Sequence, residues 1–153
     1  MFKLDGEHLC SYSAGLAAPP EVIGPVPEGI RATFYITGGE VSGPKLRGKV
    51  RGVGADWGLM RHDGVFELDV RATLETHDGA LIYAHYRGLG DMGPDGYAKF
   101  LEGKLPPRMA LRTTPAFRTA APQYQWLHRL QCVGIGEANL ETFIVSYDVY
   151  ALR

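Results

Sequence analysis

Short runs of alternating apolar and polar residues dominate the chain and predict β-strands. The clearest runs cover residues 55–62, 65–77 and 80–88, and the pairs Asp63-Gly64 and Asp78-Gly79 separate them. Asp-Gly favours tight hairpin turns, because both residues tolerate a positive φ. We therefore predict a three-stranded antiparallel meander in which each turn is a two-residue loop.

Two-residue loops define which side chains share a face of this meander. They place one set of apolar side chains together on one face: Trp57, Leu59, Phe66, Leu68, Val70, Leu74, Leu81 and Tyr83. On the other face, Asp56, Arg71 and Tyr86 form a line across three strands. A carboxylate, a guanidinium and a phenol in this arrangement can orient a polar ligand. The alternative is a solvent-facing ion pair, which is common and contributes little stability.

A second hairpin is predicted at the C-terminus, from strands at 124–135 and 142–152. One of its faces is apolar and carries Trp126 and His128. A histidine on such a face is either a hydrogen-bonded core residue or, if the face lines a cavity, the best candidate acid–base group of the chain. The opposite face pairs Arg129 with Asp148, which predicts a structural ion pair.

The remaining segments complete an all-β fold with one short helix. Pro94 and Gly103 bracket a helix at 95–102, because proline is favoured at a helix start and glycine just after its end. Further strands are predicted at 7–14, 30–37, 45–51 and 108–117, whereas the proline-rich stretch 17–27 is predicted to be an extended loop. About eight to ten antiparallel strands can close a barrel, so we predict one β-barrel domain over residues 1–153.

Composition narrows the classes of function. Sixteen Lys and Arg residues against seventeen Asp and Glu residues argue against a nucleic-acid partner, and no apolar stretch is long enough for a membrane-spanning helix. No secretory leader is recognised, and Cys10 and Cys132 form no metal motif, so we expect free thiols and a cytoplasmic protein. The histidines lack metal-ligand spacing and the glycines match no dinucleotide or phosphate loop. We therefore expect neither a metal nor a cofactor.

Several motifs make the chain resemble the domain-of-unknown-function 3237 family over nearly its whole length. They are Gly54-Ala55-Asp56-Trp57, Leu68-Asp69-Val70-Arg71, Thr76 to Tyr83 (THDGALIY), Arg112-Thr113-Thr114-Pro115, Tyr124 to Leu127 (YQWL) and Tyr147-Asp148-Val149-Tyr150. The resemblance implies a lipocalin-like barrel with a central cavity, and it implies no general activity. It adds Asp69 and Arg112 to the candidate site residues. The family usually has Asn where this chain has His128, which indicates either acquired catalysis or a neutral exchange.

Two functional hypotheses remain at this point. The first is a cofactor-independent enzyme acting on a small aromatic or carbonyl-bearing molecule as a lyase, isomerase, cyclase or lactone hydrolase. Asp56 or His128 would be its base, Arg71 would hold an oxyanion or carboxylate, and Tyr83 or Tyr86 would donate a hydrogen bond. The substrate-binding residues would be Trp57, Asp69, Tyr83, Tyr86, Arg112 and Trp126. The second hypothesis is a non-catalytic barrel that binds a small hydrophobic molecule. Two strongly apolar faces in so short a chain also predict a homodimer.

Overall fold

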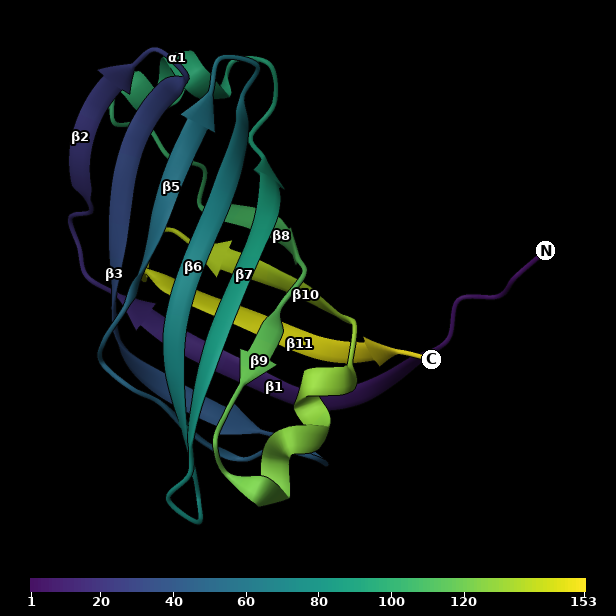
Figure 1. Cartoon of the computed structure of the whole chain (residues 1–153). Coiled ribbons are helices and arrows are strands. Elements are labelled where there is room, and N and C mark those ends of the chain that lie inside the picture. The colour runs from purple at the N-terminus through teal and green to yellow at the C-terminus, as the bar shows by residue number, and fades with distance from the viewer.

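Eight antiparallel strands close into a β-barrel in the computed structural model, which describes all 153 residues. The closed ring runs β6-β5-β3-β1-β11-β10-β8-β7 and returns to β6 through the β6–β7 pairing. In Figure 1, β3, β5, β6 and β7 run steeply, and β1, β10 and β11 cross them at a large angle behind. The predicted all-β barrel is therefore confirmed.

The elements follow one another in chain order with short connections. Their bounds are β1 (Gly6–Leu16), β2 (Glu21–Val26), β3 (Gly29–Ser42), β4 (Gly48–Val50), β5 (Ala55–Arg61), β6 (Val65–Thr76), β7 (Leu81–Asp91), α1 (Gly96–Leu101), β8 (Arg108–Thr113), β9 (Ala116–Arg118), the 3-10 helix η1 (Pro122–Arg129), β10 (Cys132–Asn139) and β11 (Ile144–Leu152).

Three short strands lie outside the ring. β4 bridges β3 and β6, β9 pairs with β7, and β2 pairs only with β3. The prediction of an extended loop over 17–27 was therefore wrong in part, because Glu21–Val26 forms an edge strand. Pro25 is tolerated there, since an edge strand has backbone groups that need no partner within the sheet.

One end of the barrel is filled by aromatic side chains and covered by the predicted helix. Phe34 packs edge-on against Phe66, with 5.9 Å between ring centroids, and Phe66 stacks on Phe100 of α1 at 6.1 Å. Phe100 is buried and anchors α1 to the barrel, and Tyr97 of α1 packs against His62 with 4.6 Å between ring centroids. The part of the interior that lies beyond this aromatic cluster contains the site described below.

Both Asp-Gly pairs lie at hairpin tips as predicted, but the loops have three residues instead of two. Met60 pairs with Phe66, and Leu74 pairs with Ile82, one residue away from the predicted register. The reason is local: only Gly64 (φ 87°) and Gly79 (φ 86°) have a positive φ, and the two aspartates do not. Each loop therefore consists of a turn followed by a glycine in the left-handed backbone conformation. This is a frequent form of three-residue hairpin loop.

The shift in register exchanges the two faces of β6 relative to its neighbours. Asp56 lies opposite Val70, and Val70 lies opposite Tyr86, so these three residues form the row that points into the barrel. Arg71 points outward from the next position of β6 and is exposed. The predicted line of Asp56, Arg71 and Tyr86 was therefore wrong: valine, not arginine, separates the carboxylate from the phenol.

The C-terminal hairpin is shorter than predicted. Residues 124–129 belong to η1, in which Pro122 starts the helix and Tyr124 and Leu127 are buried with helical spacing. The predicted ion pair between Arg129 and Asp148 was wrong, because Arg129 lies in η1 and Asp148 accepts a hydrogen bond from Ser11.

The expected homodimer rested on two apolar faces that one barrel would not bury. The structure turns the apolar side of β6 and that of β11 into the same core. The homodimer therefore remains a prediction, and the argument from two unburied apolar faces no longer supports it.

Candidate functional site

A narrow cavity lies inside the barrel beyond the aromatic cluster. The volume that can hold the centre of a water molecule is about 40 Å³. This corresponds to room for roughly three water molecules, at 10–15 Å³ each. Sixteen residues line the cavity, of which fourteen are hydrophobic: Tyr12, Ala14, Leu16, Ile36, Val50, Asp56, Leu68, Val70, Ala72, Leu74, Ala84, Tyr86, Pro115, Phe117, Val145 and Tyr147.

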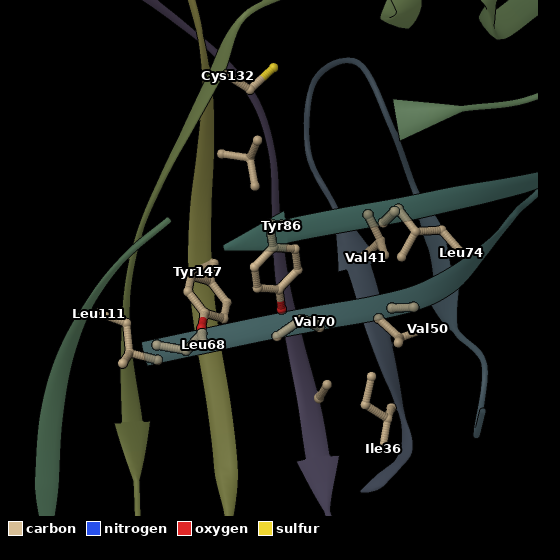
Figure 2. Close-up of a cluster of buried hydrophobic side chains, with 14 of the residues drawn as sticks. Ile36, Val41, Val50, Leu68, Val70, Leu74, Tyr86, Leu111, Cys132 and Tyr147 are labelled. Carbon is tan, nitrogen blue, oxygen red and sulfur yellow. The ribbon is translucent and has the colours of Figure 1, made fainter. Parts of the chain in front are cut away.

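Three tyrosines from three strands meet in the lining of this cavity. The hydroxyl of Tyr12 donates a hydrogen bond to the hydroxyl oxygen of Tyr86 at 2.7 Å. The ring of Tyr147 lies 5.0 Å from that of Tyr12 and 5.8 Å from that of Tyr86, measured between centroids. Figure 2 shows the hydroxyls of Tyr86 and Tyr147 pointing the same way, toward Leu68 and Val70 on β6. The three rings therefore form one packed group with its hydroxyls toward the interior.

Gly136 explains how the ring of Tyr147 fits between the strands. A Cβ at position 136 would lie 2.3 Å from the Tyr147 ring, closer than two carbon atoms can approach. The neighbouring strand therefore needs glycine at this point, because the aromatic ring occupies the place where a side chain would be.

Asp56 is the only carboxylate that lines the cavity, and it has no cationic partner there. Its side chain is 9% exposed, and the backbone N–H of Asp69 donates to its Oδ1 at 2.9 Å. No protein group donates a hydrogen bond to Oδ2. Burial in this apolar environment, together with the nearby charge of Asp69, raises the pKa of Asp56 to about 7, against the lowering effect of the backbone hydrogen bond.

Asp56 is also the only group lining the cavity that exchanges protons near neutral pH. The lining contains no Lys, Arg or His. Burial raises the pKa of Tyr12, Tyr86 and Tyr147 well above that of free tyrosine, so all three hydroxyls stay protonated. The site therefore combines one potential base with neutral hydrogen-bond donors, which is the minimum needed for proton transfer to and from a bound molecule.

Four of the sequence-predicted site residues lie together on the outer surface instead. The guanidinium of Arg71 lies over the ring of Trp57, 4.4 Å from the centroid. Asp69 lies 3.7 Å from His85, measured between Oδ1 and Nε2, and Tyr83 is 46% exposed. The barrel wall separates this cluster from the cavity, so Arg71 does not reach a molecule bound beside Asp56.

The other three predicted residues lie at separate places. Arg112 lines an outer groove between β7, β8 and β10, and its Nη1 donates to the carbonyl of the adjacent Leu111 at 2.8 Å. Trp126 and His128 lie in η1, where His128 is exposed and accepts a hydrogen bond from the Thr119 N–H at 3.0 Å. Of the nine predicted residues, the structure brings only Asp56 and Tyr86 together in the cavity.

Sequence reasoning missed Tyr12 and Tyr147 as site residues. A signal was present, because both tyrosines have polar neighbours in sequence and apolar residues two positions away, which places them on the buried side of their strands. A buried tyrosine hydroxyl usually requires a hydrogen-bonding partner. Two inward-facing tyrosines on neighbouring strands therefore indicate a polar point inside an otherwise apolar barrel.

The structure contains no group of three or more His, Cys, Asp and Glu side chains that could hold a metal ion. Both cysteines are buried and unpaired. Neither helix has the length and apolar composition required to cross a membrane.

Comparison with known sequences identifies the family. A model described as protein of unknown function (DUF3237) matches residues 5–152. The chain belongs to this family. Its relatives include a UPF0311 protein of Rhodopseudomonas palustris (strain TIE-1), which is 36% identical over 130 residues, and the match covers 83% of each chain. The resemblance seen in the sequence motifs is therefore confirmed for this DUF3237 protein.

Solved structures show the same barrel. A protein from Acinetobacter baumannii AYE, described as a beta-barrel like protein, superimposes with a TM-score of 0.83 at 32% identity, covering 100% of this chain and 98% of the other. A protein described as an enzyme from Penicillium herquei superimposes with a TM-score of 0.68 at 22% identity, covering 100% and 97%. The second similarity shows the fold alone.

Proposed function

We propose that this DUF3237 protein is an enzyme that uses its own side chains for proton transfer on a small molecule bound in the barrel cavity. The observation that carries the proposal is Asp56, a buried carboxyl group with no cationic partner, whose pKa of about 7 suits a general base at neutral pH. Perturbed carboxyl groups that open on a cavity are characteristic of functional sites. The reactions that fit are those of a lyase, isomerase, cyclase or lactone hydrolase.

In this proposal, Asp56 and the tyrosines have complementary roles. Ionised Asp56 takes a proton from a C–H or O–H group of the substrate, and a tyrosine hydroxyl donates a hydrogen bond to the oxygen on which negative charge develops. The hydrogen bond from Tyr12 to Tyr86 polarises the Tyr86 hydroxyl and strengthens it as a donor. Protonated Asp56 then returns its proton to another atom of the substrate or to a leaving group, which restores the carboxylate.

The structural similarity to the Penicillium herquei protein supports this proposal only in a general way. That protein is described as an enzyme, so a barrel of this shape is compatible with catalysis. A fold alone does not specify a reaction, and the proposal depends on the chemistry of the cavity in this chain.

A non-catalytic binding barrel is the second candidate. Fourteen of the sixteen lining residues are hydrophobic, which suits simple retention of an apolar molecule. In this case the carboxyl group of Asp56 serves the fold, through its hydrogen bond with the backbone of Asp69.

The test compares two variants in turnover assays on compounds that first raise the melting temperature of the protein. Asp56→Asn keeps the shape and the hydrogen-bond acceptor but removes the base, so turnover should fall by at least about a hundredfold while binding weakens by no more than about tenfold. His128→Asn is the matched control, because it removes the other candidate base outside the cavity, and it should retain full turnover. Loss of turnover in His128→Asn alone would overturn the assignment of Asp56. Binding without turnover of any bound compound would favour the second candidate.

A further inference from the structure

The cavity of the proposed enzyme is almost free of charge along its whole length. Its only ionisable groups are Asp56 and three tyrosines, and the three tyrosine rings pack together. The opposite part is lined by aliphatic side chains, including Ile36, Val50 and Leu74. Tyr12, Leu16 and Val145 are the half-buried residues of the lining, and the other lining residues are buried.

We infer that the ligand of this cavity is an uncharged molecule that inserts a small apolar ring or chain carrying one phenolic, enolic or carbonyl oxygen, with this oxygen placed beside Asp56 and the tyrosine hydroxyls. This inference rests on the proposed function, because it names the substrate class of the same site. Carboxylates and phosphates are excluded by charge. No cation lines the cavity to receive an anion, and Asp56 repels one.

Two features favour an oxygen over an ammonium group as the polar end. The hydroxyls of Tyr12 and Tyr86 meet at 2.7 Å, and the hydroxyls of Tyr86 and Tyr147 point toward β6, so hydroxyl groups rather than ring faces are presented. Recognition of ammonium by aromatic residues needs the ring faces. In addition, Oδ2 of Asp56 has no donor from the protein, which leaves an acceptor for one ligand O–H.

The size of the cavity limits what can enter. Room for roughly three water molecules is less than the volume of a single ring, so a ring or a short chain enters only when lining side chains move apart, and a fused ring system is too large. The packed rings of Tyr12, Tyr86 and Tyr147 occupy one side of the cavity and limit the space further.

Three probes of matched size test the inference by calorimetry at about pH 7.5, close to the pKa of Asp56. They are 4-ethylphenol, 4-ethylbenzoate and 4-ethylbenzylammonium, which differ mainly in the charge of the polar end. We expect 4-ethylphenol to bind at least about tenfold more tightly than either charged probe, a difference of about 1.4 kcal/mol. Stronger binding of either charged probe, or no binding of any probe, overturns the inference.

Two variants test whether the probe binds in the cavity. Ala72→Leu fills part of the space beside Asp56 and should abolish binding of 4-ethylphenol. Thr73→Val changes the adjacent residue, which points outward, and should leave binding intact. If Ala72→Leu fails to fold, Asp56→Asn gives the second measurement. It should weaken the binding of 4-ethylphenol by about tenfold, because the charged hydrogen-bond acceptor is lost. Unchanged affinity in the folded cavity variants overturns the inference.

The two proposals fail in different ways. If 4-ethylphenol binds selectively but no phenol, enol or carbonyl compound is turned over, the ligand class stands and the catalytic role of Asp56 is removed. If turnover depends on Asp56 but the substrates are carboxylates or amines, the proposed function stands and the inference about the ligand is wrong.

Discussion

Replacement of Asp56 by asparagine should change how the stability of the protein depends on pH. The pKa of Asp56 is about 7 in the folded protein, against 3.8 for an ordinary aspartate, so the folded protein keeps a proton that the unfolded chain has released between these values. The contribution of Asp56 to stability is therefore complete below about pH 4 and is lost as the pH rises to 7. A shift of this size corresponds to about 4 kcal/mol, at about 1.4 kcal/mol per pH unit.

Urea unfolding of the wild type and Asp56→Asn between about pH 4 and pH 8.5 measures this effect. Asparagine does not titrate and can still accept the backbone hydrogen bond from Asp69. The stability of the variant relative to the wild type should therefore rise by about 4 kcal/mol across the range and then level off above pH 7. Other titrating groups cancel in the difference. A difference that stays constant, or decreases with pH, would refute the assignment of a raised pKa to Asp56.

Further predictions concern the surroundings of this site and the hairpin loops. Asp69→Asn removes a half-buried charge that raises the pKa of Asp56, so the stability difference between pH extremes should become smaller in the same titration. Gly79→Ala should lower the free energy of unfolding in urea by about 1 kcal/mol, because alanine is strained at a positive φ. The loss should not be larger, because the added Cβ meets no atom within 4 Å. Gly64→Ala should cost clearly more, since its Cβ would lie 1.7 Å from the carbonyl oxygen of Gly93. Equal costs for the two substitutions would contradict this packing argument.

Local chemistry in the sequence predicts most of the elements. Asp63-Gly64 and Asp78-Gly79 mark two hairpin tips, and Pro94 and Gly103 bracket α1, because these residues act on the backbone within a few positions of themselves. The boundaries that were mispredicted have local reasons as well. Pro122 starts a 3-10 helix in a run whose apolar residues also suit a strand, and the pattern of Tyr124 and Leu127 fits a helical spacing.

The candidate site was only partly predictable. Asp56 and Tyr86 were identified as functional candidates, and the structure places both in the cavity. Arg71 was expected between them, but it lies on the outer surface over Trp57. The error is a single residue of register: a three-residue loop instead of a two-residue loop moves every side chain of β6 to the opposite face.

The sequence by itself determined the all-β class, the turn positions, the short helix and the family of this protein, because alternation and turn residues act over short distances. Only the tertiary structure decided which side of β6 faces the interior and which tyrosines meet Asp56. Tyr12, Tyr86 and Tyr147 are far apart in sequence, and closure of the barrel brings them together. Closure also places Val70, and not a cation, beside Asp56. The raised pKa of this carboxyl group follows from that burial, which no local pattern specifies.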